Sequence, residues 1–236
     1  MKTLLIFLLL LVVPAYATND IYNGLAGWWT FDSNDILGTS VTDKSGNNDT
    51  GTTHGSPSSI AGKLGQALSF NGSTQYISLA DIPESGSFTI SCWALLNAYT
   101  SVNPIPCVSR AHFGGLYPQN YFISLRSGTG TCSTHDWLFQ MSDNGGDIAT
   151  ACSNVIAVLN QWTLLTGVYK SSSRTLTLYI NGVAQSTTGN ASALASTYYT
   201  STETTNIATY DTNASPFSGN VDDVRLYNRA LSAAEI

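Results

Sequence analysis

Charged side chains are scarce in this chain, and their scarcity excludes several functions. Only 10% of the 236 residues are charged, and the formal net charge is −6. A nucleic-acid-binding surface needs clustered Lys and Arg, so we expect no nucleic-acid partner. Glutamate is especially rare: Glu84, Glu203 and Glu235 stand far apart in the sequence. Because glycoside hydrolysis requires two carboxyl groups flanking one bond, we predict that the chain is not an enzyme.

Other catalytic signatures are missing as well. The sequence has no Gly-x-Ser-x-Gly nucleophile elbow and no glycine-rich phosphate loop. The histidines at positions 54, 112 and 135 are isolated. A β-glucan hydrolase is therefore the least favoured of the functions considered.

The chain has no long apolar run after its first residues. Lys2 precedes an apolar run at 4–13, and the small-x-small sequence AYA follows at 15–17. This arrangement is typical of a secretory signal peptide, although a retained N-terminal anchor is an alternative. We predict cleavage after Ala17, no later membrane span, and a secreted or cell-surface mature chain at 18–236.

Four cysteines follow the predicted signal peptide, and their spacing does not fit a zinc site. An even number in a secreted chain indicates two disulfides, for which three pairings exist. We favour Cys92 with Cys107 and Cys132 with Cys152, because each pair flanks one segment. Free buried cysteines are the alternative.

Helical periodicity is absent until the end of the chain, and short alternating segments predominate. Turn signals such as Asn71-Gly72 and Asn181-Gly182 separate these segments. Many short strands with turns between them predict an all-β sandwich of two antiparallel sheets. The polar stretch at 33–63 predicts surface loops. Ser232 and Glu235 have the spacing of a capping box, which predicts the start of a helix.

Five segments in order resemble one known family. They are GLAGWWTFD, GKLGQALSFNGSTQYISL, SFTISCWALL, NQWTLLTGVYKSSSRTLTLYINGV and GNVDDVRLYNRALSAAEI. Together they resemble the laminin-G-like jelly-roll domains of the concanavalin A-like lectin/glucanase superfamily. The resemblance covers the whole mature chain and implies a two-sheet jelly roll at 18–236. The abrupt end of the last segment suggests that this domain is the N-terminal part of a longer protein.

The resemblance also implies one structural calcium ion where the first and last strands meet. Carried over by position, the candidate ligands are Asp32, Asn71, Gly72 and Asp222. Carboxylate and carbonyl oxygens are the ligands that calcium prefers. The alternatives are a turn cap for Asp32 and a hydrogen-bonded partner of a backbone or arginine group for Asp222. In the last strand, simple alternation places Asp222 on the same face as Val224.

Aromatic side chains suggest how the domain binds a ligand. Sugar sites on β sandwiches combine a ring that stacks with polar groups that bind hydroxyls. The resemblance assigns Trp29, Trp93 and Trp162 to the core. The candidate ligand-binding residues are Trp28, Tyr117, Tyr121 and Trp137, although burial under a loop is the alternative for each.

These observations predict a secreted, non-catalytic recognition module with a structural calcium ion. Its expected partner is a glycan or polysaccharide, as for a lectin, or an extracellular protein. The alternative is an adhesion or structural domain of a larger surface protein that binds protein rather than glycan.

Overall fold

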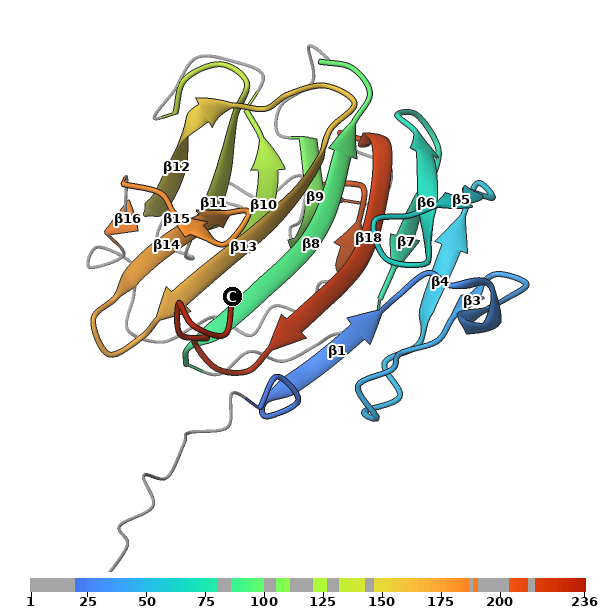
Figure 1. Ribbon diagram of the computed structural model, residues 1–236, viewed down its shortest axis with the longest axis horizontal. Coiled ribbons are helices and arrows are strands. Elements are labelled where there is room, and N and C mark those ends of the chain that lie inside the picture. The colour runs from blue at the N-terminus through green and yellow to red at the C-terminus, as the bar shows by residue number, and fades with distance from the viewer. Residues whose placement is uncertain are drawn as a thin grey trace, which may run out of the picture.

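The computed structural model describes residues 20–79, 86–99, 105–110, 121–126, 132–142, 147–186, 189–190, 204–211 and 215–236. These residues form two nine-stranded antiparallel sheets that pack face to face (Figure 1). The predicted all-β sandwich is therefore confirmed. No helix in the described part of the chain is long and apolar enough to cross a membrane.

Sheet A lies in front in Figure 1, and its longest strands are neighbours at its centre. Strand β18 pairs with β8, and β8 pairs with β13. Strand β1 joins the sheet by pairing with β18, and β16 joins it by pairing with β14. The strands in order are β15 (Val183–Ala184), β14 (Thr175–Ile180), β13 (Trp162–Lys170), β8 (Phe88–Leu96), β18 (Ser218–Tyr227), β6 (Gln66–Asn71) and β5 (Ser58–Ala61), with β1 (Leu25–Trp29) and β16 (Gly189–Asn190) beside this path.

Sheet B forms the second layer and includes part of the predicted loop region at 33–63. A short 3-10 helix, η1 (Ser33–Asp35), leads into it, and three short strands follow. The strands in order are β12 (Ile148–Ile156), β11 (Asp136–Ser142), β10 (Tyr121–Leu125), β9 (Ile105–Arg110), β17 (Thr205–Ile207), β7 (Tyr76–Ser78), β4 (Gly51–His54), β3 (Ser40–Val41) and β2 (Ile36–Leu37).

The core lies between the two sheets, because each strand turns alternate side chains inward. Trp29 is fully buried there, and its indole N–H donates to the carbonyl of Asp49 at 3.0 Å. Phe139 of β11 packs directly over β13, where a Cβ on Gly167 would lie 2.7 Å from the ring. Glycine at this position therefore lets the two sheets approach closely.

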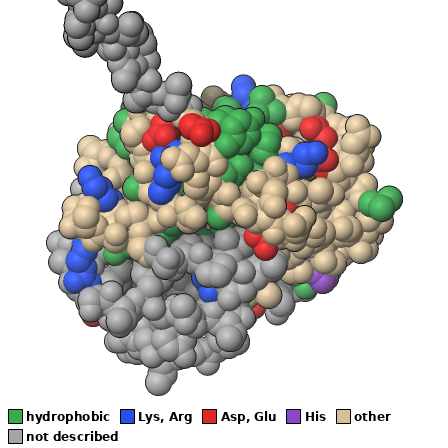
Figure 2. All heavy atoms as spheres, turned by 90° about the horizontal axis from the view of Figure 1, so that it is seen from below, with side chains coloured by type: hydrophobic (Ala, Val, Ile, Leu, Met, Phe, Trp, Pro, Cys, Tyr) green, Lys and Arg blue, Asp and Glu red, His purple; other side chains and the backbone are tan. Residues whose placement is uncertain are grey.

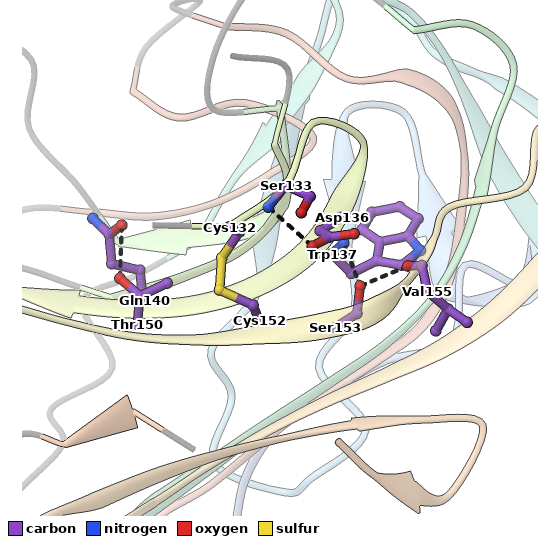
Figure 3. Close-up of a disulfide and its surroundings, with 9 residues drawn as sticks. All are labelled: Cys132, Ser133, Asp136, Trp137, Gln140, Thr150, Cys152, Ser153 and Val155. Atoms are coloured by element: carbon purple, nitrogen blue, oxygen red, sulfur yellow. Dashed lines mark hydrogen bonds between the residues drawn. A yellow bond between two sulfur atoms is a disulfide. The ribbon is translucent and has the colours of Figure 1, made fainter. Parts of the chain in front are cut away.

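Both predicted disulfides are present. Cys92–Cys107 joins β8 of sheet A to β9 of sheet B. Cys132–Cys152 ties the segment before β11 to β12 (Figure 3). In Figure 3 the hydroxyl of Ser153 accepts the N–H of Trp137 at 2.9 Å and donates to the carbonyl of Val155 at 2.7 Å. These bonds hold β12 where its register against β11 shifts.

Strand β18 departs from simple alternation at Asp223. The φ of Asp223 is 46°, and the pairing with β8 shifts between Asp222 and Arg225. This is a β-bulge, which inserts one residue and reverses the faces that follow. Val221 and Val224 are both fully buried in the core, so Asp222 and Arg225 both lie on the outer face. The prediction that Asp222 shares a face with Val224 is wrong for this reason.

The end of the chain forms a turn rather than the predicted helix start. One half of the capping box is present, because the N–H of Ser232 donates to Glu235 Oε2 at 2.8 Å. The hydroxyl of Ser232 donates to the same oxygen at 2.8 Å, and the N–H of Glu235 bonds the Ser232 carbonyl instead of the hydroxyl. Arg229 donates to Glu235 Oε1 at 2.7 Å. The Arg229 hydrogen bond, together with the bonds from Ser232, lowers the pKa of Glu235 to about 2.

Candidate ligand-binding face and calcium site

The outer face of sheet A carries apolar side chains at its centre. Trp93 and Leu95 alternate on β8 with the buried Cys92 and Ala94, and Trp162 lies opposite Leu95 on β13. The outer face of a solvated antiparallel sheet is ordinarily polar. Trp93 and Trp162 are half-buried on this outer face, so their predicted core positions are wrong. Trp29 alone of the three lies in the core.

Strand pairing brings polar side chains together beside these aromatic rings. The register aligns Trp28 with Arg225, Arg225 with Ser91, and Ser91 with Thr166 across four strands. The hydroxyls of Ser91 and Thr166 lie 3.2 Å apart. A row of hydrogen-bonding groups therefore crosses the outer face of sheet A.

A pocket of about 190 Å³ opens on this face. Lys63 stands over the indole of Trp93, with Nζ 4.9 Å from the ring centroid. Leucine side chains and the row of polar groups complete the wall, so apolar and hydrogen-bonding surfaces face each other. The lining residues include Leu64, Ser91, Trp93, Leu164, Thr166 and Arg225, and Asp223, Tyr227 and the C-terminal residues Leu231, Glu235 and Ile236 also border the pocket.

Trp28 is fixed at the edge of this face by the bulge of β18. Its indole N–H donates to Asp223 Oδ1 at 2.7 Å, and its backbone N–H donates to Asp43 Oδ1 at 2.9 Å. The guanidinium of Arg225 lies 5.0 Å from the ring centroid and pairs with Asp223 at 3.0 Å. The structure thus places Trp28 beside the pocket that contains Trp93.

The other predicted ligand-binding residues do not reach this face. Tyr121 is 1% exposed and packs against Phe88 at a ring-centroid distance of 4.9 Å. Trp137 is 2% exposed and lies in the same core. Both face inward because they alternate with the outward residues of β10 and β11, so neither ring is open to a ligand. Tyr117 lies outside the described residues.

Asp222 is the centre of the candidate calcium site. It is fully buried on the outer face of β18, beside the turn at 62–65 that joins β5 to β6. Its Oδ2 accepts the N–H of Leu64 at 2.8 Å, whereas its Oδ1 is buried without a hydrogen-bond partner. Burial raises the pKa of Asp222 to about 6, although backbone hydrogen bonds from Leu64 and Lys63 oppose the rise. A buried carboxylate oxygen without a partner is costly and would be stabilised by a cation.

Asp32 meets the other end of the same turn. Its Oδ1 accepts the N–H of Gln66 at 2.8 Å. A Cβ on Gly65, whose φ is +59°, would collide with this oxygen, and a Cβ on Gly62 would lie 2.6 Å from Asp222 Oδ2. The two glycines therefore let both carboxylates approach the backbone of the turn, and the donor set fits calcium in kind. The described residues include no cluster of three or more His, Cys, Asp or Glu, so carbonyl oxygens or water would complete such a site.

Asn71 and Gly72 lie at the opposite end of β6 from Gln66. The distance along the strand is about 17 Å, given the rise per residue of a β-strand. Asn71 Oδ1 instead accepts the N–H groups of Ser73 at 2.9 Å and Thr74 at 3.0 Å, which closes its own turn. The structure thus separates Asn71 and Gly72 from Asp32 and Asp222, and the four cannot share one ion.

Asp43 organises the loop beneath Trp28, and the sequence analysis did not single it out. Its carboxylate accepts the N–H groups of Trp28, Ser45 and Asp49 and the hydroxyl of Ser45. Burial favours a higher pKa, but these bonds outweigh it and hold the pKa of Asp43 below its usual value. The signal available in the sequence was the turn-rich segment DKSGNND, which begins at this residue.

Comparison with known proteins agrees with this architecture. No curated protein matches the chain. Among solved structures, domain 4 of AbnA, a GH43 extracellular arabinanase from Geobacillus stearothermophilus in complex with arabinotriose, is 21% identical with a TM-score of 0.68, and the match covers 89% of this chain and 95% of that one. The binding domain of Paraclostridial Mosquitocidal Protein 1 is 17% identical with a TM-score of 0.66, over 90% of this chain and 50% of that one. A sialidase from Trypanosoma rangeli in complex with the inhibitor DANA is 14% identical with a TM-score of 0.61, over 89% of this chain and 32% of that one.

These likenesses show a shared fold, and this chain spans only half or less of the toxin domain and the sialidase. A family model described as the concanavalin A-like lectin/glucanases superfamily matches residues 71–236, which is well over half of the chain. The chain therefore belongs to the concanavalin A-like lectin/glucanases superfamily.

Proposed function

We propose that the chain is an extracellular, non-catalytic recognition module that binds glycan on the outer face of sheet A. The observation that carries this proposal is the pocket beside Trp93, in which an indole and leucine side chains face hydroxyl groups. A sugar ring has an apolar face of C–H groups and a rim of hydroxyls. The pocket offers matching surfaces, because aromatic rings stack with the apolar face and Ser91, Thr166 and Arg225 can bond the rim.

The charged groups of the pocket support binding rather than hydrolysis. Asp223 pairs with Arg225, and Glu235 pairs with Arg229. A general acid of a glycosidase needs a raised pKa, whereas the pKa of Glu235 is lowered to about 2. Glu235 is therefore not suited to donate a proton to a leaving group. The two disulfides favour an oxidising compartment, which supports an extracellular location.

We include a structural calcium ion in this proposal. Asp32, Asp222 and backbone oxygens of the turn at 62–65 would hold it. The bound ion would supply positive charge to the buried carboxylate of Asp222. Because Lys63 and Leu64 of this turn border the pocket, holding the turn in place would also shape the ligand-binding face.

A glycan array followed by isothermal titration calorimetry tests the proposed function. We expect binding to at least one neutral glycan, and we expect Trp93→Ala to weaken it by about tenfold or more, the equivalent of about 1.4 kcal/mol. Tyr76→Ala is the matched control, because Tyr76 is a half-buried aromatic on the outer face of sheet B. Absence of glycan binding by the calcium-loaded protein would exclude this function and favour a protein partner.

A further inference from the structure

A second depression adjoins the pocket beside Trp93. It is a shallow crevice of about 10 Å³ where β1 meets β18, lined by Ile21, Tyr22, Leu25 and Trp28 together with Arg225 and Tyr227, so a sugar ring would lie on its exposed rings rather than within it. Arg225 and Tyr227 also line the first pocket. The two hollows are therefore neighbours that share a ridge made by two residues of β18.

The separation of the two tryptophans follows from strand pairing. Trp28 aligns with Arg225, and Arg225 aligns with Ser91, two residues before Trp93 on β8. Two strand spacings of about 4.8 Å and a rise of about 3.4 Å per residue place the two Cα atoms about 12 Å apart. This distance exceeds the reach of a single sugar ring, so one ring cannot contact both tryptophans.

The second depression has aromatic walls of its own. Tyr22 is 64% exposed, and its ring centroid lies 6.3 Å from that of Trp28 at an interplanar angle of 56°. Ile21, 37% exposed, adds apolar surface. Figure 2 looks at the end of the sandwich where β1 begins and shows a hydrophobic patch with acidic and basic side chains on its rim.

Arg229 fixes the turn that carries Tyr22. Its Nε donates to the carbonyl of Asn23 at 2.6 Å, and its Nη2 donates to the carbonyl of Asp20 at 3.2 Å. The carboxylate of Asp20 accepts the N–H of Tyr22 at 3.0 Å. The backbone beneath Tyr22 is thus held before any ligand arrives, which lowers the entropic cost of binding there.

The charged groups in and beside the ridge form ion pairs. Asp223 neutralises Arg225, and Glu235 neutralises Arg229. The bond to Asp223 also fixes the guanidinium of Arg225, a residue that lines both hollows. A ridge of this kind suits a neutral ligand that crosses it and offers hydroxyls along its length.

We infer that the two depressions are consecutive subsites for one linear, neutral oligosaccharide, with one sugar ring against Trp93 and a later ring against Trp28 and Tyr22. This inference rests on the proposed function of the first pocket. It assigns recognition to several rings of one chain rather than to a single terminal sugar. Tyr22 and Trp28 are then the residues that make affinity depend on chain length.

Calorimetric titration with oligosaccharide ladders tests the inference. The probes are arabino-, xylo- and cello-oligosaccharides, each from monosaccharide to hexasaccharide, titrated into the full chain with calcium present. For the ladder that binds, we expect affinity to rise by about tenfold between the single sugar and the chain that spans both hollows, and to level off beyond it. Tyr22→Ala should remove this rise and leave monosaccharide affinity unchanged, and Trp28→Ala should act in the same direction.

Tyr22 is mostly exposed, so its replacement leaves the packing of the sandwich intact, and Tyr76→Ala again serves as the control. Affinity that is equal for the monosaccharide and the hexasaccharide would overturn the inference and leave the proposed function standing. A length dependence that persists in Tyr22→Ala and Trp28→Ala would also overturn it. If neither the glycan array nor any ladder shows binding, the proposed function fails and the inference fails with it.

Discussion

Replacement of Asp222 by Asn separates the cost of the buried carboxylate from the benefit of a bound cation. In the metal-free protein the pKa of Asp222 rises from 3.8 to about 6, chiefly because the side chain is buried. The folded state therefore binds the proton more tightly than the unfolded state does. The stabilisation this provides is complete below about pH 4 and is lost as the pH rises through about 6.

The size of the effect follows from the pKa. A rise from 3.8 to about 6 corresponds to about 3 kcal/mol, because each tenfold change in proton affinity is worth about 1.4 kcal/mol. The substituted amide would not titrate, and its side-chain oxygen would still accept the N–H of Leu64. We therefore expect Asp222→Asn to match the original protein at pH 4 and to exceed it by up to about 3 kcal/mol at pH 7 when calcium is removed.

Calcium should reverse the order of stability at pH 7. A ligand at a thousand times its dissociation constant stabilises the folded state by about 4 kcal/mol, and only the protein with Asp222 should gain this. Urea unfolding at pH 4 and pH 7, with calcium and in metal-free buffer, gives the unfolding free energy of both proteins under each condition. Parallel pH profiles of the two proteins without metal would refute the argument from burial, and an equal response to calcium would refute the metal site.

Two further substitutions test the glycine turn beside Asp32 and the disulfide between Cys132 and Cys152. Gly65→Ala should lower the unfolding free energy by at least about 1 kcal/mol, because φ is +59° and the new Cβ collides with Asp32 Oδ1. Urea unfolding measures this loss. Gly38→Ala is the control for positive φ alone, since no atom lies within 4 Å of a Cβ at that position. Replacing Cys132 and Cys152 together by Ala should cost about 3 kcal/mol, because the disulfide closes a loop with a sequence separation of 20; an unchanged urea midpoint would contradict this.

The sequence was sufficient for the architecture because the strands depend on local patterns. Alternating apolar residues and the Asn181-Gly182 turn predicted the hairpin of β14 and β15, and the structure confirms it. The spacing of the cysteines favoured the pairing that the structure contains. Each of these signals acts over a few residues or within one pair of strands.

The site was harder to predict because it depends on contacts between distant strands. Period-two alternation cannot reveal the bulge at Asp223, which turns Asp222 and Arg225 to the same side of the sheet. Trp93 and Cys92 are adjacent and so face opposite sides of β8, but nothing local indicates which of two apolar faces is left uncovered. Tyr22 carries no local signal either, because it becomes part of a depression only when β1 pairs with β18.

The position of β18 in sheet A has a consequence for how the protein is made. This strand follows all the other strands of its sheet in the sequence, yet it lies between β8 on one side and β1 and β6 on the other. Until it leaves the ribosome, β5 and β6 have no connection to the strands of the sheet on its far side. Such non-local pairing slows folding and leaves apolar edges exposed in partial chains. Sheet A should therefore close only after β18 has been synthesised.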